Sequence, residues 1–244
     1  MSNINELVEK IIAAHGGMDT WNKIDEINVT ARTGGILPLT KLKYSSLSKI
    51  NFTVYPKKIQ TVFNDFPEIG SKGVFDNGSV YIENGKGEIE DEREDPRSYF
   101  NRISKKLYWD FLDTIYFTGY AGWNYLCTPF IFNTYNFEFS AVVDGIEDNG
   151  EKLEGLKVVY PDEIHTHSKE QTFYFDSFGL LRRLDYTADV IGSWAHAAHY
   201  CYDYVKYGGI SFPLSRKVYM RKSDGSHVDF PIVFWIKISS IIIK

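Results

Sequence analysis

The chain has little cysteine, no excess of positive charge and no recognisable catalytic signature of the common kinds. Its only two cysteines, Cys127 and Cys201, provide neither a disulfide framework nor the paired spacing of a zinc site. Lysine and arginine number 27 against 32 aspartates and glutamates, a net charge of −5 without a basic stripe, so we expect no nucleic-acid partner. A phosphate-binding glycine loop and the Gly-x-Ser-x-Gly motif are both absent, and we predict no cofactor.

Residues 115–132 carry no charge and are about long enough to cross a bilayer. The stretch contains Thr118, Asn124 and Thr128, however, and Pro129 interrupts it, and burying such polar groups in lipid is costly. We therefore predict no transmembrane segment. The first six residues, Met-Ser-Asn-Ile-Asn-Glu, lack the basic and then apolar segments of a secretory signal, which predicts a cytoplasmic protein.

A helical segment rich in aromatic residues separates two groups of strand-like sequence. Its large apolar side chains recur three and four residues apart, the spacing of one helix face: Tyr108, Phe111, Leu112, Ile115, Tyr116, Trp123 and Leu126. Pro129 lacks the N–H group that a helix needs, so we expect the helix to end there. We predict that the segment covers the concave face of a sheet and closes an apolar cavity.

Short antiparallel hairpins dominate the rest of the chain, and nothing alternates as strand, helix and strand. Asn77 and Gly78 predict a two-residue hairpin, and residues 40–47 are among the predicted strands. We predict a single domain over residues 1–244, mainly β with a helical lid (α+β), in which one strongly curved antiparallel sheet forms an unclosed barrel. Its parts are N-terminal helices at 1–24, first strands at 26–92, the helical lid at 96–132 and second strands at 136–244.

Two sets of motifs resemble known proteins. His-Gly-Gly at 15–17, followed by Trp-Asn-Lys-Ile at 21–24, resembles the opening of LolA-like proteins. Most of the chain is similar to a family of bacterial proteins through longer motifs at residues 109–113, 116–121, 128–130, 165–168, 170–176, 179–183 and 198–200. The LolA-like resemblance implies an unclosed β-barrel with helices over its mouth, as in periplasmic lipoprotein carriers. The same fold resembles that of an enzyme of pigment biosynthesis, so the resemblance allows either binding or catalysis.

Two neighbouring hairpins predict a row of His167, Asp189 and His199 across three strands. A pairing centred on Trp194 places Asp189 opposite His199, and the preceding hairpin places His167 opposite Asp189. Side chains opposite one another have Cβ atoms about 4.5–5.5 Å apart, which is contact distance here. An aspartate between two imidazoles makes one a general base, so all three are candidate catalytic residues. The same three are, as a lesser alternative, the ligand set of an open metal site.

The same pairing predicts a second row of Gln171, Asp185 and Asp203. Opposed carboxylates that share a proton have one raised pKa, which makes Asp185 a further catalytic candidate. If this face of the sheet meets water, both rows are ordinary surface groups. A shift of one residue in register would also move His167 to the other face and remove the first row.

The aromatic side chains of the lid are candidate ligand-binding residues, and the simpler alternative is that they only fill the core. The candidates are Trp109, Tyr116, Tyr120, Trp123, Tyr125 and Phe130, together with Gln171. Tyrosine and tryptophan place hydrogen-bonding groups at the rim of an apolar pocket. Two functions stay open: a carrier or binding protein for an apolar or aromatic small molecule, and a small biosynthetic enzyme (cyclase, isomerase or hydrolase) that uses the His–Asp–His row. An exposed aromatic helix would also suit a partner protein.

Overall fold

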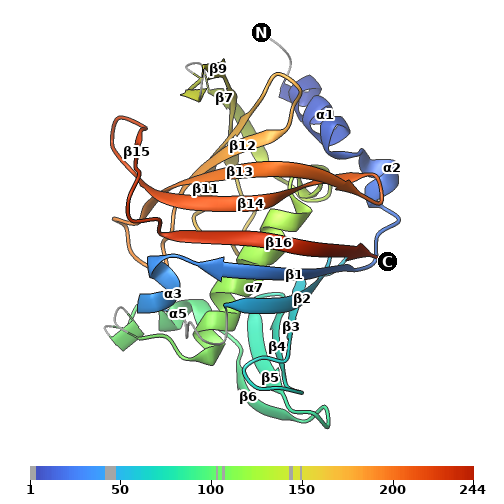
Figure 1. The fold of residues 1–244 in the computed structure, drawn as a ribbon, viewed down its shortest axis with the longest axis vertical. Helices are drawn as coiled ribbons and strands as arrows, with labels where there is room; N and C mark the ends of the chain where they lie inside the picture. The colour runs from blue at the N-terminus through green and yellow to red at the C-terminus, as the bar shows by residue number, and fades with distance from the viewer. Residues whose placement is uncertain (1–3, 42–47, 103, 106–107, 143–144, 149) are drawn as a thin grey trace.

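One large antiparallel sheet curves around a central helix, α7 (Phe111–Cys127) (Figure 1). The structure is a computed structural model and describes residues 4–41, 48–102, 104–105, 108–142, 145–148 and 150–244. The other helices are α1 (Ile4–His15), α2 (Met18–Trp21), α3 (Ile36–Thr40), α5 (Pro96–Tyr99) and the 3₁₀ helix η1 (Phe130–Asn133).

The strands fall into two groups on either side of the helical segment. The first group is β1 (Ile27–Gly34), β2 (Lys49–Tyr55), β3 (Gln60–Asn64), β4 (Lys72–Asp76), β5 (Ser79–Glu83) and β6 (Ile89–Arg93). The second is β7 (Glu138–Val142), β8 (Glu147–Asp148), β9 (Glu151–Lys152), β10 (Glu154–Val159), β11 (Glu170–Phe175), β12 (Leu181–Thr187), β13 (His196–Tyr207), β14 (Ile210–Arg221), β15 (His227–Val228) and β16 (Phe234–Ile243).

Fourteen of these strands form one sheet, in the order β6-β5-β4-β3-β2-β1-β16-β14-β13-β12-β11-β10-β7, with β15 paired to β14 beside this path. The last strand, β16, joins the two groups because it pairs with β1 on one side and β14 on the other. Among the described strands, β6 and β7 each have one partner only, so the sheet is curved but not closed. The predicted fold class is confirmed.

Local sequence accounts for several of these elements. Leu7, Ile11 and Ile12 form the buried face of α1, and positive φ angles of 128° at Gly16 and 80° at Gly17 end the helix, as the sequence predicted. Positive φ angles at positions 77 and 78 likewise build the predicted hairpin between β4 and β5.

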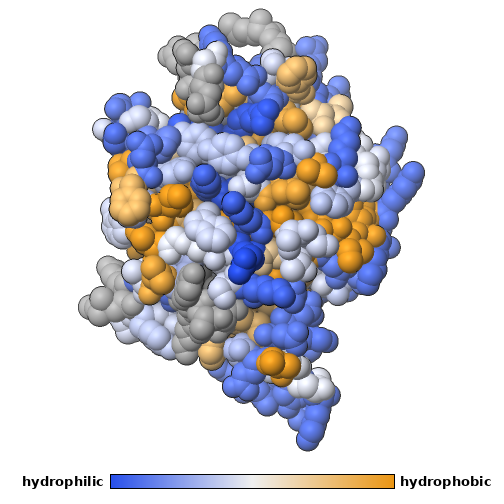
Figure 2. All heavy atoms as spheres, viewed as in Figure 1, coloured by the Kyte–Doolittle hydropathy of each residue, from blue (hydrophilic) through white to orange (hydrophobic). Residues whose placement is uncertain are grey.

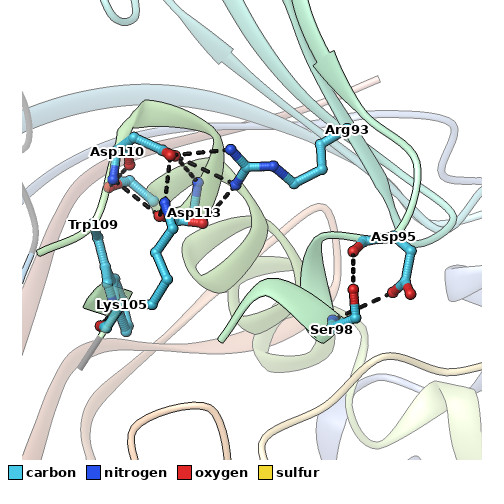
Figure 3. Close-up of polar contacts among 8 residues, drawn as sticks. Arg93, Asp95, Ser98, Lys105, Trp109, Asp110 and Asp113 are labelled. Atoms are coloured by element: carbon cyan, nitrogen blue, oxygen red, sulfur yellow. Dashed lines mark hydrogen bonds and ion pairs between the residues drawn. The ribbon is translucent and has the colours of Figure 1, made fainter. Parts of the chain in front are cut away.

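The N-terminus of α7 is held by charged side chains (Figure 3). Asp110 accepts a hydrogen bond from the Asp113 backbone N–H at 2.8 Å, and the Asp113 carboxylate accepts one from the Asp110 N–H at 3.0 Å, which is a capping box. Arg93, at the end of β6, binds both carboxylates at 3.0 and 2.6 Å, and Lys105 binds both at 2.6 and 2.5 Å. These contacts attach the start of the helix to an edge strand of the sheet.

One face of α7 packs directly on the first group of strands. The helix approaches the sheet closely at Gly119, where an added Cβ would lie 2.4 Å from the Cβ of Phe75. The Gly119 carbonyl accepts a hydrogen bond from the Thr61 hydroxyl at 2.9 Å, and the indole of Trp123 donates to the Lys58 carbonyl at 2.7 Å. The lid predicted at 96–132 therefore occupies the concave side of the sheet.

Helix α3 was not predicted. The strand predicted at 40–47 starts at Thr40, which is the last residue of α3, and residues 42–47 lie outside the described residues. None of the described helices is long and apolar enough to cross a membrane.

Candidate functional site

An apolar cavity of about 110 Å³ lies between α7 and the concave face of the sheet. This volume is several times what one water molecule needs. Ala121 and Gly122 face it from the helix, and Ala188, Ala195 and Ala197 face it from β13 and the turn that precedes that strand. Because these side chains are small, the space between the helix and the sheet is not filled here. The rest of the wall is mainly apolar: Leu37, Ile50, Phe52, Phe63, Phe117, Ile191, Val218, Val233, Phe234 and Ile236.

The polar part of the cavity wall is a chain of hydrogen bonds through His167. The Tyr120 hydroxyl lies 2.9 Å from His167 Nδ1, and the Tyr125 hydroxyl lies 2.6 Å from Nε2 and 3.2 Å from the hydroxyl of Tyr186. The imidazole also stacks on the Tyr186 ring, with centroids 4.3 Å apart. His167, Tyr125 and Tyr186 line the cavity, whereas Tyr120 lies behind them.

Burial lowers the pKa of His167 to about 3, so the ring is neutral at physiological pH. A neutral imidazole has one N–H donor and one acceptor nitrogen. One of the two tyrosines that contact it therefore donates a hydrogen bond and the other accepts one. Burial also raises the pKa of Tyr120 and of Tyr125 well above the ordinary value, which keeps both hydroxyls protonated.

His199 lies next to this chain of hydrogen bonds. Its ring meets that of Tyr125 edge-on at 4.7 Å, and neither ring nitrogen has a hydrogen-bond partner among the described residues. Burial, followed by the charge of Arg216, lowers the pKa of His199 well below its ordinary value. Arg216 itself donates to the Tyr125 carbonyl at 2.8 Å.

The predicted row of His167, Asp189 and His199 does not form, although the Asp189 backbone N–H donates to the His167 carbonyl at 3.1 Å, so these two residues are neighbours as predicted. In the observed register Leu184 lies opposite His199, five positions away from the predicted partner. The two histidines point into the interior, but Asp189 lies beyond β12, with its carboxylate half exposed and 3.7 Å from Arg97. The described part of the chain contains no group of three histidine, cysteine or acidic side chains able to hold a metal ion.

The second predicted row is also wrong. Asp185 lies opposite Thr172 and Ala198, not opposite Gln171 and Asp203. Because Leu184 and Tyr186 point inward, Asp185 between them points to the convex face, where an acid is compatible with its surroundings.

On that face Asp185 forms a two-point ion pair with Arg183, whose Nε and Nη2 lie 2.6 and 2.8 Å from the carboxylate oxygens. Burial raises the pKa of Asp185, and the charge of Arg183 opposes this effect. Asp185 therefore belongs to a buried ion pair on the far side of the sheet from the cavity.

The predicted ligand-binding residues divide into three sets. Tyr125 lines the cavity. Tyr120 and Gln171 line a smaller void of about 10 Å³ behind it, the size of one water molecule. The remaining four are buried in the packed core: Trp109, Tyr116, Trp123 and Phe130.

The core set has partners of its own. The Tyr116 hydroxyl lies 2.8 Å from His165 Nδ1, the Trp109 indole donates to the Lys105 carbonyl, and Phe130 stacks on Trp21 at 4.2 Å. Sequence reasoning missed Phe117, Tyr186, His196 and the four alanines of the wall. A cluster of alanines beside an aromatic strand is the signal that would have indicated them.

Comparisons with known proteins define the fold. No family model matches the sequence, and no curated protein matches it. The structure is similar to that of a LolA superfamily protein from Nitrosomonas europaea, with a TM-score of 0.54 and 11% identity over 100% of this chain and 94% of that one. It is also similar to a DUF1329 family protein from Desulfovibrio piger, with a TM-score of 0.50 and 12% identity over 100% and 94% of the two chains. The chain has the LolA-like fold, and likeness at this identity defines the fold alone.

Proposed function

We propose that this chain is a binding or carrier protein for an apolar or aromatic small molecule, held between α7 and the concave face of the sheet. The cavity carries the proposal, because its wall is apolar except at a few defined positions. Ligand sites are commonly concave and apolar, with a small number of polar groups that orient the ligand. The LolA-like fold supports the same proposal, since it surrounds such a space with an unclosed sheet.

On this proposal, the hydroxyls of Tyr125 and Tyr186 are the groups that would contact the polar part of the ligand. Both lie at the cavity wall, both are protonated, and neither carries charge. A ligand with a carbonyl, hydroxyl or ether group at one end would form a hydrogen bond there and bury its apolar remainder against Phe52 and Phe117. A charged group would lose its hydration without gaining an opposite charge from these two hydroxyls.

The enzyme alternative receives less support from the geometry. A general base works best with a pKa near the working pH, and burial holds the pKa of His167 at about 3. His199 has a lowered pKa as well, and neither Asp189 nor Asp185 contacts the cavity. The hydrogen-bonded position of His167 between two tyrosines therefore suits orientation of a ligand better than proton transfer.

The variant Ala121→Phe tests the proposal by filling the cavity from the helix. We expect a folded protein that binds a neutral apolar fluorophore, 1-N-phenylnaphthylamine, at least tenfold more weakly than the wild type. Ala141→Phe is the matched control, because Ala141 is exposed on the edge strand β7 and should leave binding unchanged.

Two measurements complete this test. Native mass spectrometry of the purified protein should show a co-purified apolar molecule that is missing from Ala121→Phe. Circular dichroism establishes that the variant is folded. Undiminished fluorophore binding by folded Ala121→Phe would contradict the proposal.

A further inference from the structure

The convex face of the sheet carries a second recess, behind the strands that form the cavity. This groove has a volume of about 510 Å³ and lies over β1, β16 and β14. Arg32, Lys217 and Lys237 line it, with Trp235 and Ser215 between them, and its described lining contains no aspartate or glutamate. Figure 2 shows strongly hydrophilic residues crossing these strands in the middle of this face.

Strand register places the positive charges directly beside one another. Arg32 lies opposite Lys237 on β16 and opposite Lys49 on β2, so three cations form one row across three strands. Lys217, one row away, lies opposite Trp235. Like charges at directly opposed positions destabilise a sheet.

No carboxylate of the described residues forms an ion pair with this row. Of the ion pairs between described residues, none includes Arg32, Lys49, Lys217 or Lys237, although many other lysines and arginines of the chain are paired. The chain as a whole is acidic, with a net charge of −5. An uncompensated cationic row in an acidic protein is a local feature with a cost, and an anion bound in the groove would remove that cost.

Trp235 provides a flat surface beside these charges. Three atoms of its indole would lie 2.4, 2.5 and 2.7 Å from a Cβ added to Gly34, its partner on β1. These similar distances indicate that the ring lies across the glycine, so only a residue without a side chain fits beneath it. Trp235 also lines the groove, and Lys217 lies opposite it on β14.

We propose that this groove binds a ligand that carries a phosphate or a similar oxyanion. The guanidinium of Arg32 matches an oxyanion with parallel hydrogen bonds, and Lys217 and Lys237 add two mobile positive charges. The part of the ligand next to the oxyanion rests on the indole of Trp235. Thr33 borders both the groove and the cavity, but the two lie on opposite faces of the sheet, so this site is independent of the proposed apolar ligand.

Inorganic pyrophosphate, followed by isothermal titration calorimetry at low salt, tests for a soluble oxyanion ligand. The double variant Arg32→Gln/Lys237→Gln should bind it at least tenfold more weakly. Lys86→Gln/Lys152→Gln is the matched control: it removes the same charge from two exposed sites elsewhere and should bind pyrophosphate as the wild type does. Trp235→Phe should weaken binding less than the charge variant.

A second assay distinguishes a phospholipid headgroup from a soluble ligand. The same variants are sedimented with vesicles of phosphatidylcholine containing phosphatidylglycerol. If the wild type binds vesicles but not pyrophosphate, and only the Arg32/Lys237 variant loses this binding, the groove binds a phospholipid headgroup. If the wild type binds pyrophosphate but not vesicles, and only the Arg32/Lys237 variant loses this binding, the groove binds a soluble oxyanion.

The thermal melt of the ligand-free Arg32→Gln/Lys237→Gln variant gives a further readout, since relief of repulsion should raise its melting temperature. Absence of binding to both probes would overturn the proposal. Equal loss of binding in the Lys86/Lys152 control would also overturn it, because the effect would then reflect net charge.

Discussion

The two faces of α7 differ in how closely they pack against the sheet. Ile115, Gly119 and Trp123 pack on the first group of strands and leave no cavity, whereas Ala121 and Tyr125 face the apolar cavity. Positions 119 and 121 are two residues apart, about 200° around the helix, so one segment serves both purposes. The difference shows that contacts on one face hold α7 on the sheet, so the other face can border the cavity without close packing.

Trp123→Ala should have the largest effect on this arrangement. The side chain is fully buried on the packed face and donates to the Lys58 carbonyl. We expect a loss of about 3–5 kcal/mol in the free energy of unfolding, as for other large-to-small changes in a core. Urea denaturation measures it, and Trp194→Ala is the control because Trp194 is 64% exposed. Equal losses in the two variants would show that α7 is not fixed by this face.

Gly119→Ala and Gly122→Ala compare the packed face of α7 with the border of the cavity by adding the same methyl group at each position. At Gly119 the methyl would overlap Phe75, and overpacking of this kind costs about 1–3 kcal/mol. At Gly122 its nearest neighbour is a Phe52 carbon at 3.6 Å, an ordinary contact, so the higher helix propensity of alanine should stabilise by about 0.5–1 kcal/mol. Chemical denaturation of both variants should give opposite signs. Changes of the same sign would contradict the difference in packing between these two positions.

Local patterns in the sequence were sufficient for much of the fold and insufficient for the site. Helix α1, the 77–78 hairpin and the lid follow from spacing and turn residues within a few positions of one another. The register of β12 with β13 depends on the irregular turn at 188–195, whose length in the folded chain no local pattern fixes. An error of five positions there reverses the faces, which separated Asp189 from His199 and moved Asp185 outward. The cavity depends on contact between Ala121 of the helix and an alanine cluster at 188–197, which are far apart in sequence.

His199→Leu tests whether the region beside Tyr125, near the end of α7, is closed to water, through the pH dependence of the free energy of unfolding. The pKa of His199 in the native state is far below the unfolded value near 6.5, because burial disfavours its charged form. Below pH 6.5 the unfolded chain therefore binds a proton that the native chain does not, and stability falls as pH falls.

At pH 5 this difference removes at most about 2 kcal/mol from the wild type, the limit for a native state that binds no proton, while leucine at the same position has no proton to bind. The variant should therefore become more stable relative to the wild type, by up to about 2 kcal/mol, when the pH of urea denaturation is lowered from 7.5 to 5. Leucine also replaces two ring nitrogens that have no described hydrogen-bond partner, so no bond is lost in the exchange. Leu184→Met, directly opposite on β12, is the control, and its effect should not change with pH. A pH-independent effect of His199→Leu would mean that His199 binds a proton in the native state, and the interior end of the lid would then be open to water.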